Sequence, residues 1–314
     1  MKCLVTGGAG FIGSNLVDRL IDDGHEVIVL DDLSTGDGAN INSKAKFHKV
    51  DVSKKSDFYL GWREDRETFG WTSLFKGVDV VFHLAALARV QPSIENPLPY
   101  HDKNVNGLIN VLEECREHGV KRLVFSSSSS VYGDVEEKDL PTSESAELNP
   151  MSPYALHKLV GEQYCELYSK LYDIETVSLR YFNVYGERQP IEGAYTLVMG
   201  IFAKQRLNNE PMTINGDGEQ RRDFTYVGDV VEANIQVGFY EHPLKGAIFN
   251  VGNGDNRSVN EIADMMGDEK IHRDPVLEPR ETLADNRELM ECFDWKPTMK
   301  IEDWVEKWKK EIGL

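Results

Sequence analysis

Short apolar segments alternate with longer amphipathic segments along most of the chain. The short segments are rich in Val, Ile, Leu and Phe, which is typical of buried β-strands. The longer segments carry apolar residues three and four positions apart, as in Ile12, Leu16, Val17, Leu20 and Ile21, which predicts helices. Predicted strands occupy 2–7, 26–32, 46–52, 78–86, 122–130, 175–186 and 247–254, and predicted helices 11–24, 100–119, 153–172 and 224–242.

This alternation predicts an α/β fold: a doubly wound parallel sheet of the Rossmann type, with helices on both faces. Continuous apolar strands suit a sheet that is covered on both sides. The pattern changes after Gly186. Region 187–223 reads as loop-rich, and 255–314 mixes polar segments with short helices, so a smaller C-terminal lobe is expected. The expected division is a nucleotide-binding domain of 1–182 with 224–252, and a substrate lobe of 183–223 with 253–314.

The connection 53–76 is long for a link between two strands. It carries Phe58, Tyr59, Trp62, Phe69 and Trp71, which indicates packing.

A glycine-rich turn lies between the first predicted strand and the first predicted helix. Gly7, Gly10 and Gly13 in "VTGGAGFIG" allow a tight turn and the close approach of a pyrophosphate to the backbone. The helix that follows offers free N–H groups and a partial positive charge. Asp31 ends the second strand, where a carboxylate accepts ribose hydroxyls and repels a 2′-phosphate. This pattern predicts NAD; the alternative is an ordinary glycine turn with a solvated aspartate.

Tyr154 and Lys158 in "SPYALHK" are one helical turn apart, after a Ser152 that can cap the helix and a Pro153 suited to its first position. A free tyrosine has a pKa of about 10, and a neighbouring ammonium lowers it by stabilising the phenolate. The phenolate could then remove a hydroxyl proton while a hydride leaves the same carbon. The alternative is a surface pair, because this spacing often arises by chance.

A serine run, "FSSSSSVYG", ends the fifth predicted strand. Ligands of open α/β sheets bind beyond the carboxyl ends of the strands, so Ser128 is placed to hydrogen-bond the reacting hydroxyl. The alternative is a set of turn-forming serines.

The net charge is −18 and the sequence pI is about 4.9. Such a field repels phosphates, so neither nucleic acid nor an anionic membrane is an expected partner. No apolar run approaches the ~20 residues that span a bilayer, and no signal peptide is expected. The four cysteines are scattered, so neither a metal site nor a disulfide framework is expected, and the cytoplasm is the expected location.

With these motifs in view, the chain resembles the extended short-chain dehydrogenase/reductase family of nucleotide-sugar enzymes over almost its whole length. Within that family it looks like a UDP-sugar 4-epimerase (UDP-glucose or UDP-N-acetylglucosamine type). The resemblance rests on "GGAGFIG", "HLAA", "NVNG", "SSSSSVYG", "SPYALHK", "RYFNVYG", "GDGEQRRDFTYVGDVV" and "FNVGNG".

The resemblance implies NAD as cofactor, with Asp31 on the adenosine ribose and Asp51 and Val52 on the adenine. The implied cofactor-binding residues are Gly7, Gly10, Phe11, Ile12, Gly13, Asp31, Asp32, Ser34, Thr35, Gly36, Asp51, Val52, Leu84, Ala85, Ala86, Asn104, Ser126, Tyr154, Lys158 and Tyr181.

The resemblance also implies a catalytic triad of Ser128, Tyr154 and Lys158, and a UDP-sugar substrate. Asn183 and Arg222 match the groups that hold the UDP phosphates, and the altered segment "HRDPVLEPRETLAD" leaves a second contact from Arg273 or Arg280 open. The implied substrate-binding residues are Val90, Ser128, Tyr154, Asn183, Thr196, Leu197, Ile214, Arg222 and Arg280.

The implied reaction is epimerisation at carbon 4 of a UDP-hexose through a 4-keto sugar, with NAD unchanged after each turnover. Thr282 aligns with a position that is small in enzymes accepting N-acetyl sugars, which favours the UDP-N-acetylglucosamine/UDP-N-acetylgalactosamine pair, with UDP-glucose/UDP-galactose as a second pair. Ser129 and Ser130 stand where the related 4,6-dehydratases and decarboxylases carry an acidic residue. The alternatives are one of those enzymes, a UDP-glucuronate 4-epimerase, or a non-catalytic NAD-binding protein. A homodimer through a four-helix bundle of 100–118 and 153–172 is expected.

Overall fold

The computed structural model describes residues 1–54, 71–191, 197–267 and 269–314. They form two compact units. The first unit comprises Met1–Ser127, Ser152–Leu179 and Asn234–Ile248, and the second comprises Ser128–Met151, Arg180–Ala233 and Phe249–Leu314. The assignment of cofactor and substrate to separate domains stays a prediction.

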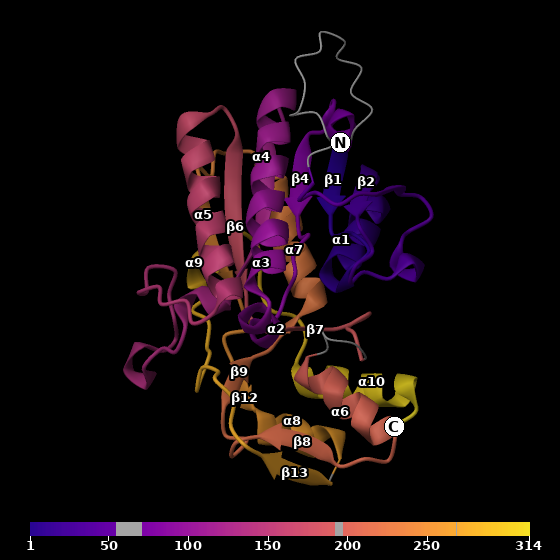
Figure 1. The fold of residues 1–314 in the computed structure, drawn as a ribbon, viewed down its shortest axis with the longest axis vertical. Coiled ribbons are helices and arrows are strands. Elements are labelled where there is room, and N and C mark those ends of the chain that lie inside the picture. The colour runs from indigo at the N-terminus through magenta and orange to yellow at the C-terminus, as the bar shows by residue number, and fades with distance from the viewer. Residues whose placement is uncertain (55–70, 192–196, 268) are drawn as a thin grey trace. The chain divides into compact units, whose positions relative to one another are not determined.

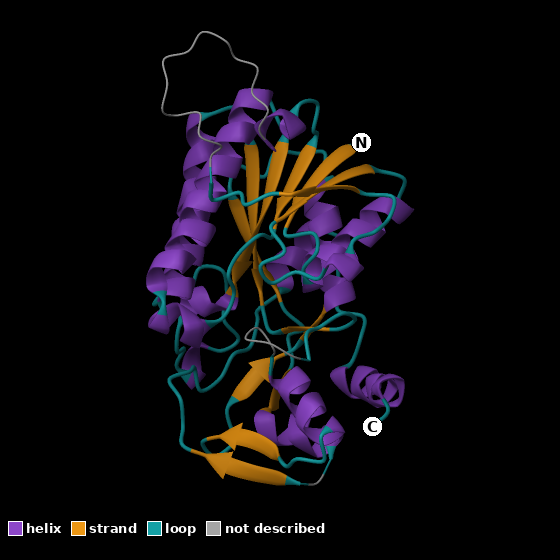
Figure 2. Cartoon of the chain, turned by 45° about the vertical axis from the view of Figure 1, so that its right-hand side comes forward, coloured by secondary structure: helices purple, strands orange, loops and turns teal. Residues whose placement is uncertain are grey.

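A seven-stranded parallel sheet confirms the predicted Rossmann-type α/β fold (Figures 1 and 2). Its strand order, β11-β6-β5-β4-β1-β2-β3, reverses between β1 and β4. In open α/β sheets a ligand binds at the carboxyl ends of the strands where the order reverses, so the ends of β1 and β4 mark the expected site. The strands are β1 (Lys2–Thr6), β2 (Glu26–Asp31), β3 (Lys46–Lys49), β4 (Val80–His83), β5 (Arg122–Ser128), β6 (Glu175–Tyr181) and β11 (Ala247–Val251).

Helices cover both faces of this sheet (Figure 2). The predicted helix at 100–119 is observed as an α-helix, a π-helical turn at Asp102–Asn106 and a second α-helix, which ends at Gly119 in the left-handed conformation. Among the helices of the described residues, none is both long and apolar enough to cross a membrane. The helices associated with the sheet are α1 (Phe11–Asp22), α2 (Val90–Glu95), α3 (Pro97–His101), α4 (Gly107–His118), α5 (Pro153–Leu171) and α7 (Val227–Gly238).

The core of the first unit packs α4 and α5 against the strands. Leu108, Val111 and Leu112 of α4 are fully buried against Leu123 of β5. Burying one such side chain contributes roughly 1.5–3 kcal/mol, so this face holds the two helices firmly in place.

The 53–76 connection is described only at its ends. Trp71 and Phe75 lie in a 3₁₀ helix (Trp71–Phe75) and are buried in the core of the first unit, which agrees with the predicted packing for Trp71. Phe58, Tyr59, Trp62 and Phe69 lie outside the described residues.

The second unit contains more regular structure than the predicted loops at 187–223. That prediction was wrong for α6, because its run "LVMGIFA" is apolar on all sides and lacks a helical stripe. Met199 and Phe202 of α6 pack with Trp304 and Trp308 of α10 in a separate core. The elements are β7 (Val184–Tyr185), α6 (Val198–Leu207), β8 (Met212–Asn215), β9 (Arg221–Asp223), β10 (Thr225–Tyr226), β12 (Asn256–Ser258), α8 (Val259–Met266), β13 (Lys270–Arg273), α9 (Arg287–Cys292) and α10 (Ile301–Ile312).

Candidate functional site

The glycine turn after β1 has no room for a side chain at Gly7 or Gly13. A Cβ at Gly13 would lie 2.1 Å from the carbonyl oxygen of Gly7, and one at Gly7 would lie 2.7 Å from the amide nitrogen of Ala85. Gly7 also has a φ of 74°, which favours glycine. Gly10 caps α1 without a side-chain hydrogen bond, so Phe11 and Ile12 begin the helix with backbone donors suited to a phosphate. The turn therefore fits a dinucleotide pyrophosphate.

Asp31 fastens the loops around this turn. One carboxylate oxygen accepts the N–H of Ala9 at 3.0 Å, and the other accepts the N–H of Leu33 at 2.8 Å. Burial raises the pKa of Asp31, and these two backbone bonds oppose that rise. A carboxylate oxygen accepts more than one hydrogen bond, so Asp31 retains capacity for ribose hydroxyls.

The loop after β2 carries three further predicted residues, Ser34, Thr35 and Gly36. The N–H of Ser34 donates to Asp32 at 2.9 Å. A Cβ at Gly36 would lie 3.0 Å from Ala9, so the loop packs closely on the glycine turn.

A lysine that the sequence did not single out joins two of the predicted cofactor residues. The Nζ of Lys103 lies 2.6 Å from Oδ2 of Asp32 and 2.6 Å from Oδ2 of Asp51. The pKa of each aspartate is lowered: burial acts against this, and the hydrogen bond from Lys103 outweighs it. Lys103 thus holds together two acidic groups that would otherwise repel each other. Its only sequence signal is its place directly before Asn104.

The end of β4 lies beside the glycine turn. Leu84 and Ala85 donate to the backbone oxygen and the hydroxyl of Thr6, at 3.1 and 3.2 Å. Farther along, Asn104 makes reciprocal hydrogen bonds with the backbone of Leu87, at 2.8 and 2.9 Å. These bonds set the course of the chain through Ala86 at the point where the strand order reverses.

The loop after β4 is tied directly to the start of α5. The hydroxyl of Ser93 donates to the carbonyl of Val90 at 2.6 Å and accepts the N–H of Tyr154 at 3.2 Å.

Val52, the other residue predicted at the adenine, is buried, and its carbonyl accepts from Asn110 at 2.9 Å.

Tyr154 and Lys158 are positioned by the N-terminal end of α5. The hydroxyl of Ser152 accepts the N–H of Ala155 at 3.2 Å, and Pro153 opens the helix, as predicted. A Cβ at Gly161 would lie 2.4 Å from the ring of Phe125, so glycine lets α5 approach β5 closely.

That close approach buries Lys158 beside the strand. Its side chain reaches the carbonyl of Ser126 at 2.6 Å, and the residue is only 4% exposed. Its Nζ lies 5.1 Å from the ring centroid of Phe125 and 5.8 Å from that of Tyr154. The predicted one-turn pair is therefore a buried amine near the aromatic ring of Tyr154, and the interpretation of both residues as a surface pair was wrong for Lys158.

Burial controls the charge on Lys158. It lowers the pKa of this amine to about 8, against the opposing charge of Glu162 one turn farther along α5. Glu162 is itself buried and accepts a hydrogen bond from the hydroxyl of Ser127. Burial, assisted by Lys158, lowers the pKa of His83 to about 3, so His83 is neutral at pH 7 and bonds Thr6 at 2.9 Å. The sequence did not predict a role for Glu162 or His83, because each matters here only through its electrostatic interaction with Lys158.

The second unit holds the remaining predicted residues. Ser128 ends β5, and its hydroxyl accepts the N–H of Ser130 at 3.2 Å. Tyr181 is buried at the end of β6. The side chain of Asn183 donates to the carbonyl of Asp223 at 3.4 Å. Leu197 precedes α6, Ile214 is buried in β8, and Thr196 lies outside the described residues.

Arg222 is a nearly buried cation in β9. Its guanidinium donates to Glu278 at 2.5 Å and to the carbonyl of Arg221 at 2.8 Å, and its side chain is 11% exposed. Burial lowers the pKa of Arg222, and the charge of Glu278 opposes that shift. Arg222 is therefore held within the second unit and is not a solvated surface arginine.

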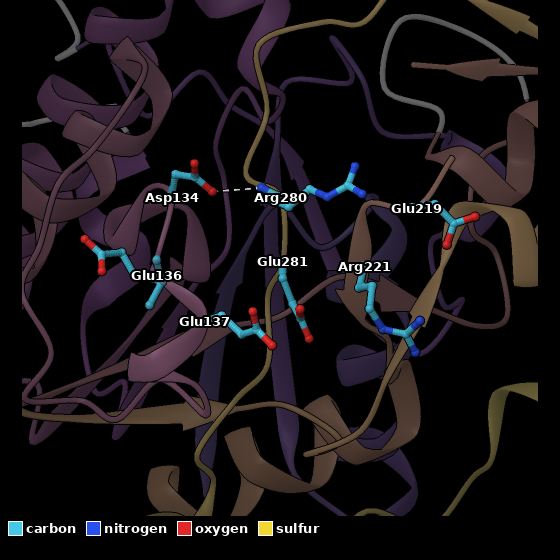
Figure 3. A pocket seen from close by; sticks show the side chains of 8 residues that line it. Asp134, Glu136, Glu137, Glu219, Arg221, Arg280 and Glu281 are labelled. Carbon is cyan, nitrogen blue, oxygen red and sulfur yellow. Dashed lines mark hydrogen bonds between the residues drawn. The ribbon is translucent and has the colours of Figure 1, made fainter. Parts of the chain in front are cut away.

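Arg280 lines a cavity of about 580 Å³ within the second unit (Figure 3). Its N–H donates to Asp134 at 2.8 Å, and its guanidinium binds both oxygens of Asp217, at 2.8 and 3.1 Å. Arg273 lies at the exposed end of β13. The cavity is lined by Asp134, Val135, Glu136, Glu137, Glu219, Arg221, Arg280 and Glu281.

Three comparisons place this geometry among known proteins. Residues 3–252 match the model of the NAD dependent epimerase/dehydratase family. A putative UDP-glucose 4-epimerase of Methanocaldococcus jannaschii is 42% identical, with 97% of this chain and 96% of the relative covered.

Two solved structures are similar over nearly their whole length. The UDP-N-acetylglucosamine 4-epimerase of Methanobrevibacter ruminantium, in complex with UDP-N-acetylmuramic acid, is 34% identical with a TM-score of 0.87, and covers 99% of this chain and 98% of its own. The UDP-glucuronic acid 4-epimerase of Bacillus cereus, in complex with UDP-glucuronic acid and NAD, is 31% identical with a TM-score of 0.88, and covers 100% and 99%.

The family match covers the glycine turn, Asp31, Tyr154 and Lys158, and the relatives extend it over the second unit. It confirms the resemblance drawn from the sequence motifs and NAD as the cofactor. The chain belongs to the NAD dependent epimerase/dehydratase family, as an enzyme of the extended short-chain dehydrogenase/reductase type.

Proposed function

We propose that this enzyme interconverts UDP-hexoses that differ in configuration at carbon 4, with the UDP-N-acetylglucosamine/UDP-N-acetylgalactosamine pair as its main substrates. One observation carries the proposal. Lys158 is a buried amine held by the carbonyl of Ser126, and its Nζ lies 5.8 Å from the ring centroid of Tyr154. An aromatic hydroxyl in that setting is suited to take and return a proton.

Tyr154 is the proposed base and acid. An ammonium on Lys158 stabilises its phenolate form, which removes the proton from the 4-hydroxyl of the sugar and later returns it to the same oxygen. NAD, when bound, supplies an acceptor and donor for the hydride at carbon 4. Because the proton and the hydride both return, no external reductant is consumed.

Ser128 is the proposed hydrogen-bonding partner of the reacting hydroxyl. It ends β5 two residues beyond Ser126, whose carbonyl holds Lys158. Its hydroxyl accepts the N–H of Ser130, which leaves its own hydrogen for the sugar oxygen.

The cofactor is proposed to bind mainly residues of the first unit. Gly7, Gly10, Phe11, Ile12 and Gly13 take the pyrophosphate, Asp31 takes the ribose, and the loop of Asp32, Ser34, Thr35 and Gly36 lies beside it. The remaining proposed contacts are Asp51, Val52, Leu84, Ala85, Ala86, Asn104, Ser126 and Tyr181.

The diphosphate of the substrate is proposed to bind Asn183 and Arg222, with Arg280 as a further contact. A nearly buried guanidinium offers a planar set of donors that matches phosphate oxygens. Leu197, Ile214 and Thr196 are proposed for the uridine, and Val90 for the sugar.

The proposed preference for an N-acetylated sugar depends on Thr282. This side chain is small, and its hydroxyl accepts the N–H of Asp223 at 3.2 Å, which keeps it turned toward the backbone. The M. ruminantium relative is named as a UDP-N-acetylglucosamine 4-epimerase, and the M. jannaschii relative is named as a putative UDP-glucose 4-epimerase. UDP-glucose/UDP-galactose is therefore the second proposed pair.

A substrate panel tests the function. The purified enzyme is incubated without added NAD with UDP-N-acetylglucosamine, UDP-glucose and UDP-glucuronate in turn, and the sugars are identified after hydrolysis. The C4 epimer of the first substrate is expected in the largest amount. A 4-keto or decarboxylated product would instead identify a dehydratase or decarboxylase, and epimerisation of UDP-glucuronate alone would move the substrate to a uronate.

The Tyr154→Phe variant tests the mechanism. Loss of the hydroxyl should lower kcat by about 10²–10⁴-fold while NAD remains bound. Tyr164→Phe on the same helix is the matched control and should keep full activity. Undiminished turnover in Tyr154→Phe would remove this residue from the mechanism.

A homodimer through α4 and α5 is also proposed. Leu156, Leu167 and Leu171 of α5 are exposed at 45–61% of their surface, which is unusual for leucines on one helix. Sedimentation equilibrium of the wild type and of Leu171→Glu measures this association.

A further inference from the structure

The ion pair between Arg222 and Glu278 joins two unequal partners. Arg222 lies in β9 with its side chain 11% exposed, whereas the side chain of Glu278 is 33% exposed. Glu278 belongs to a segment without helix or strand that follows β13, and its neighbours 274–277 are all exposed. The arginine is therefore held by a strand, and the glutamate is carried by a loop.

A nearly buried guanidinium requires an anion. Removing a cation from water is unfavourable unless a counter-charge and hydrogen bonds replace the water. Glu278 meets this need, with one oxygen 2.5 Å from the guanidinium and the other 3.3 Å from the side-chain nitrogen of Gln220. Asp134 adds a weaker favourable charge.

A diphosphate satisfies the same arginine more fully than Glu278 does. The guanidinium gives only one of its nitrogens to Glu278, while its planar fork suits bidentate contact with phosphate oxygens. The two anions cannot share the site without repulsion, because like charges at contact distance destabilise each other.

We propose that Glu278 is a specificity-determining residue that occupies the phosphate contact of Arg222 in the free enzyme and is displaced by the diphosphate of the substrate. This inference rests on the proposed function, which assigns the substrate phosphates to Arg222. A ligand can therefore bind the guanidinium of Arg222 only if its negative charge displaces the carboxylate of Glu278. A diphosphate carries enough charge to displace Glu278, whereas an uncharged nucleoside does not.

The Glu278→Gln variant tests the inference on the full-length enzyme loaded with NAD. The amide keeps the shape and an oxygen acceptor for Arg222, and removes the competing charge. Titration calorimetry with UDP is expected to give a Kd about tenfold lower than in the wild type, while the Kd for uridine stays the same. Asp274→Asn is the matched control, because it removes the same charge from the same exposed loop, and its Kd for UDP should stay within about twofold.

Thermal unfolding gives a second readout. Without ligand, Glu278→Gln should melt below the wild type, because Arg222 has lost its counter-charge; with saturating UDP the two midpoints should converge. A Kd for UDP that is unchanged or higher in Glu278→Gln, or a gap in midpoint that persists with UDP, overturns the inference. Failure of the wild type to bind UDP would overturn the proposed function instead, so the two failures are distinguishable.

Discussion

The glycine turn of the first unit and the arginines of the second unit, which we propose hold NAD and the diphosphate of the substrate, offer hydrogen-bond donors to an anion in different ways. In the first, the donors are backbone groups at a turn where a Cβ at Gly13 would meet a carbonyl oxygen at 2.1 Å. In the second, the donors are arginines, and Arg222 and Arg280 are each already paired with a carboxylate of the same unit, Glu278 and Asp217.

Under the proposed function, this difference distinguishes a cofactor that stays bound from a substrate that exchanges. A backbone cradle cannot be filled by a neighbouring side chain, so it suits a cofactor that stays bound between turnovers. A paired arginine must release its partner before it binds, so it suits a substrate that enters and leaves.

The largest expected effect comes from breaking the cradle. Gly13→Ala should abolish bound NAD and lower the free energy of unfolding by about 1–3 kcal/mol, because the added methyl overlaps the Gly7 carbonyl. Gly38→Ala is the control, since a Cβ there meets nothing within 4 Å. NAD released from the denatured protein and urea unfolding provide the measurements. A Gly13→Ala enzyme with a full complement of NAD would refute the tight cradle.

The next effect tests the buried cation of the first unit. The pKa of Lys158 is lowered from 10.5 to about 8, so the ammonium is present below pH 8 and is lost as the pH rises. In the proposed mechanism the ammonium stabilises the phenolate of Tyr154, so kcat should fall by about tenfold per pH unit above pH 8. Lys158→Arg keeps its charge at high pH and should remove this alkaline limb, even if its rate is lower. A wild-type profile that stays flat to pH 10 would contradict the prediction.

A smaller effect is expected from Lys103, which forms ion pairs with two of the proposed cofactor residues. Lys103→Met leaves Asp32 and Asp51 without their shared cation, and NAD should dissociate roughly fivefold faster, which corresponds to about 1 kcal/mol. Lys54→Met is the control, because Lys54 lies 3.6 Å from Asp51 with a side chain that is 81% exposed. A stopped-flow experiment measures the rate of NAD release from the Lys103→Met and Lys54→Met variants. Equal rates in the two variants would exclude Lys103 from cofactor binding.

The smallest effect tests a half-buried carboxylate of the second unit, Glu144. Burial raises the pKa of Glu144 from 4.5 to about 7, so the folded state binds its proton more tightly than the unfolded state does. The free energy of unfolding that this tighter proton binding contributes is fully present below pH 4.5 and is lost as the pH rises through 7. Glu144→Gln keeps an oxygen to accept the N–H of Asn250 and should be more stable than the wild type by on the order of 1 kcal/mol at pH 8, but not at pH 4.5. Urea unfolding at both values measures this, and a gain independent of pH would point to packing instead.

Sequence patterns located those features that depend on short spacings. The strand and helix order, the glycine turn, Asp31 and the Tyr154–Lys158 pair all follow from backbone geometry over a few residues or from the repeat of one strand and one helix. The helix α6 was missed because its run of apolar residues has no helical periodicity, so no short spacing marks it as a helix.

The sequence by itself determined the fold class, the cofactor and the residues proposed for the chemistry. Only the tertiary structure decided which charges meet: Lys103 with Asp32, 71 residues apart, and Arg222 with Glu278, 56 residues apart. It also decided that Lys158 is buried and close to neutral His83. Local patterns report backbone conformation within one element, whereas ion pairing and burial depend on how distant elements pack, and no spacing along the chain encodes that.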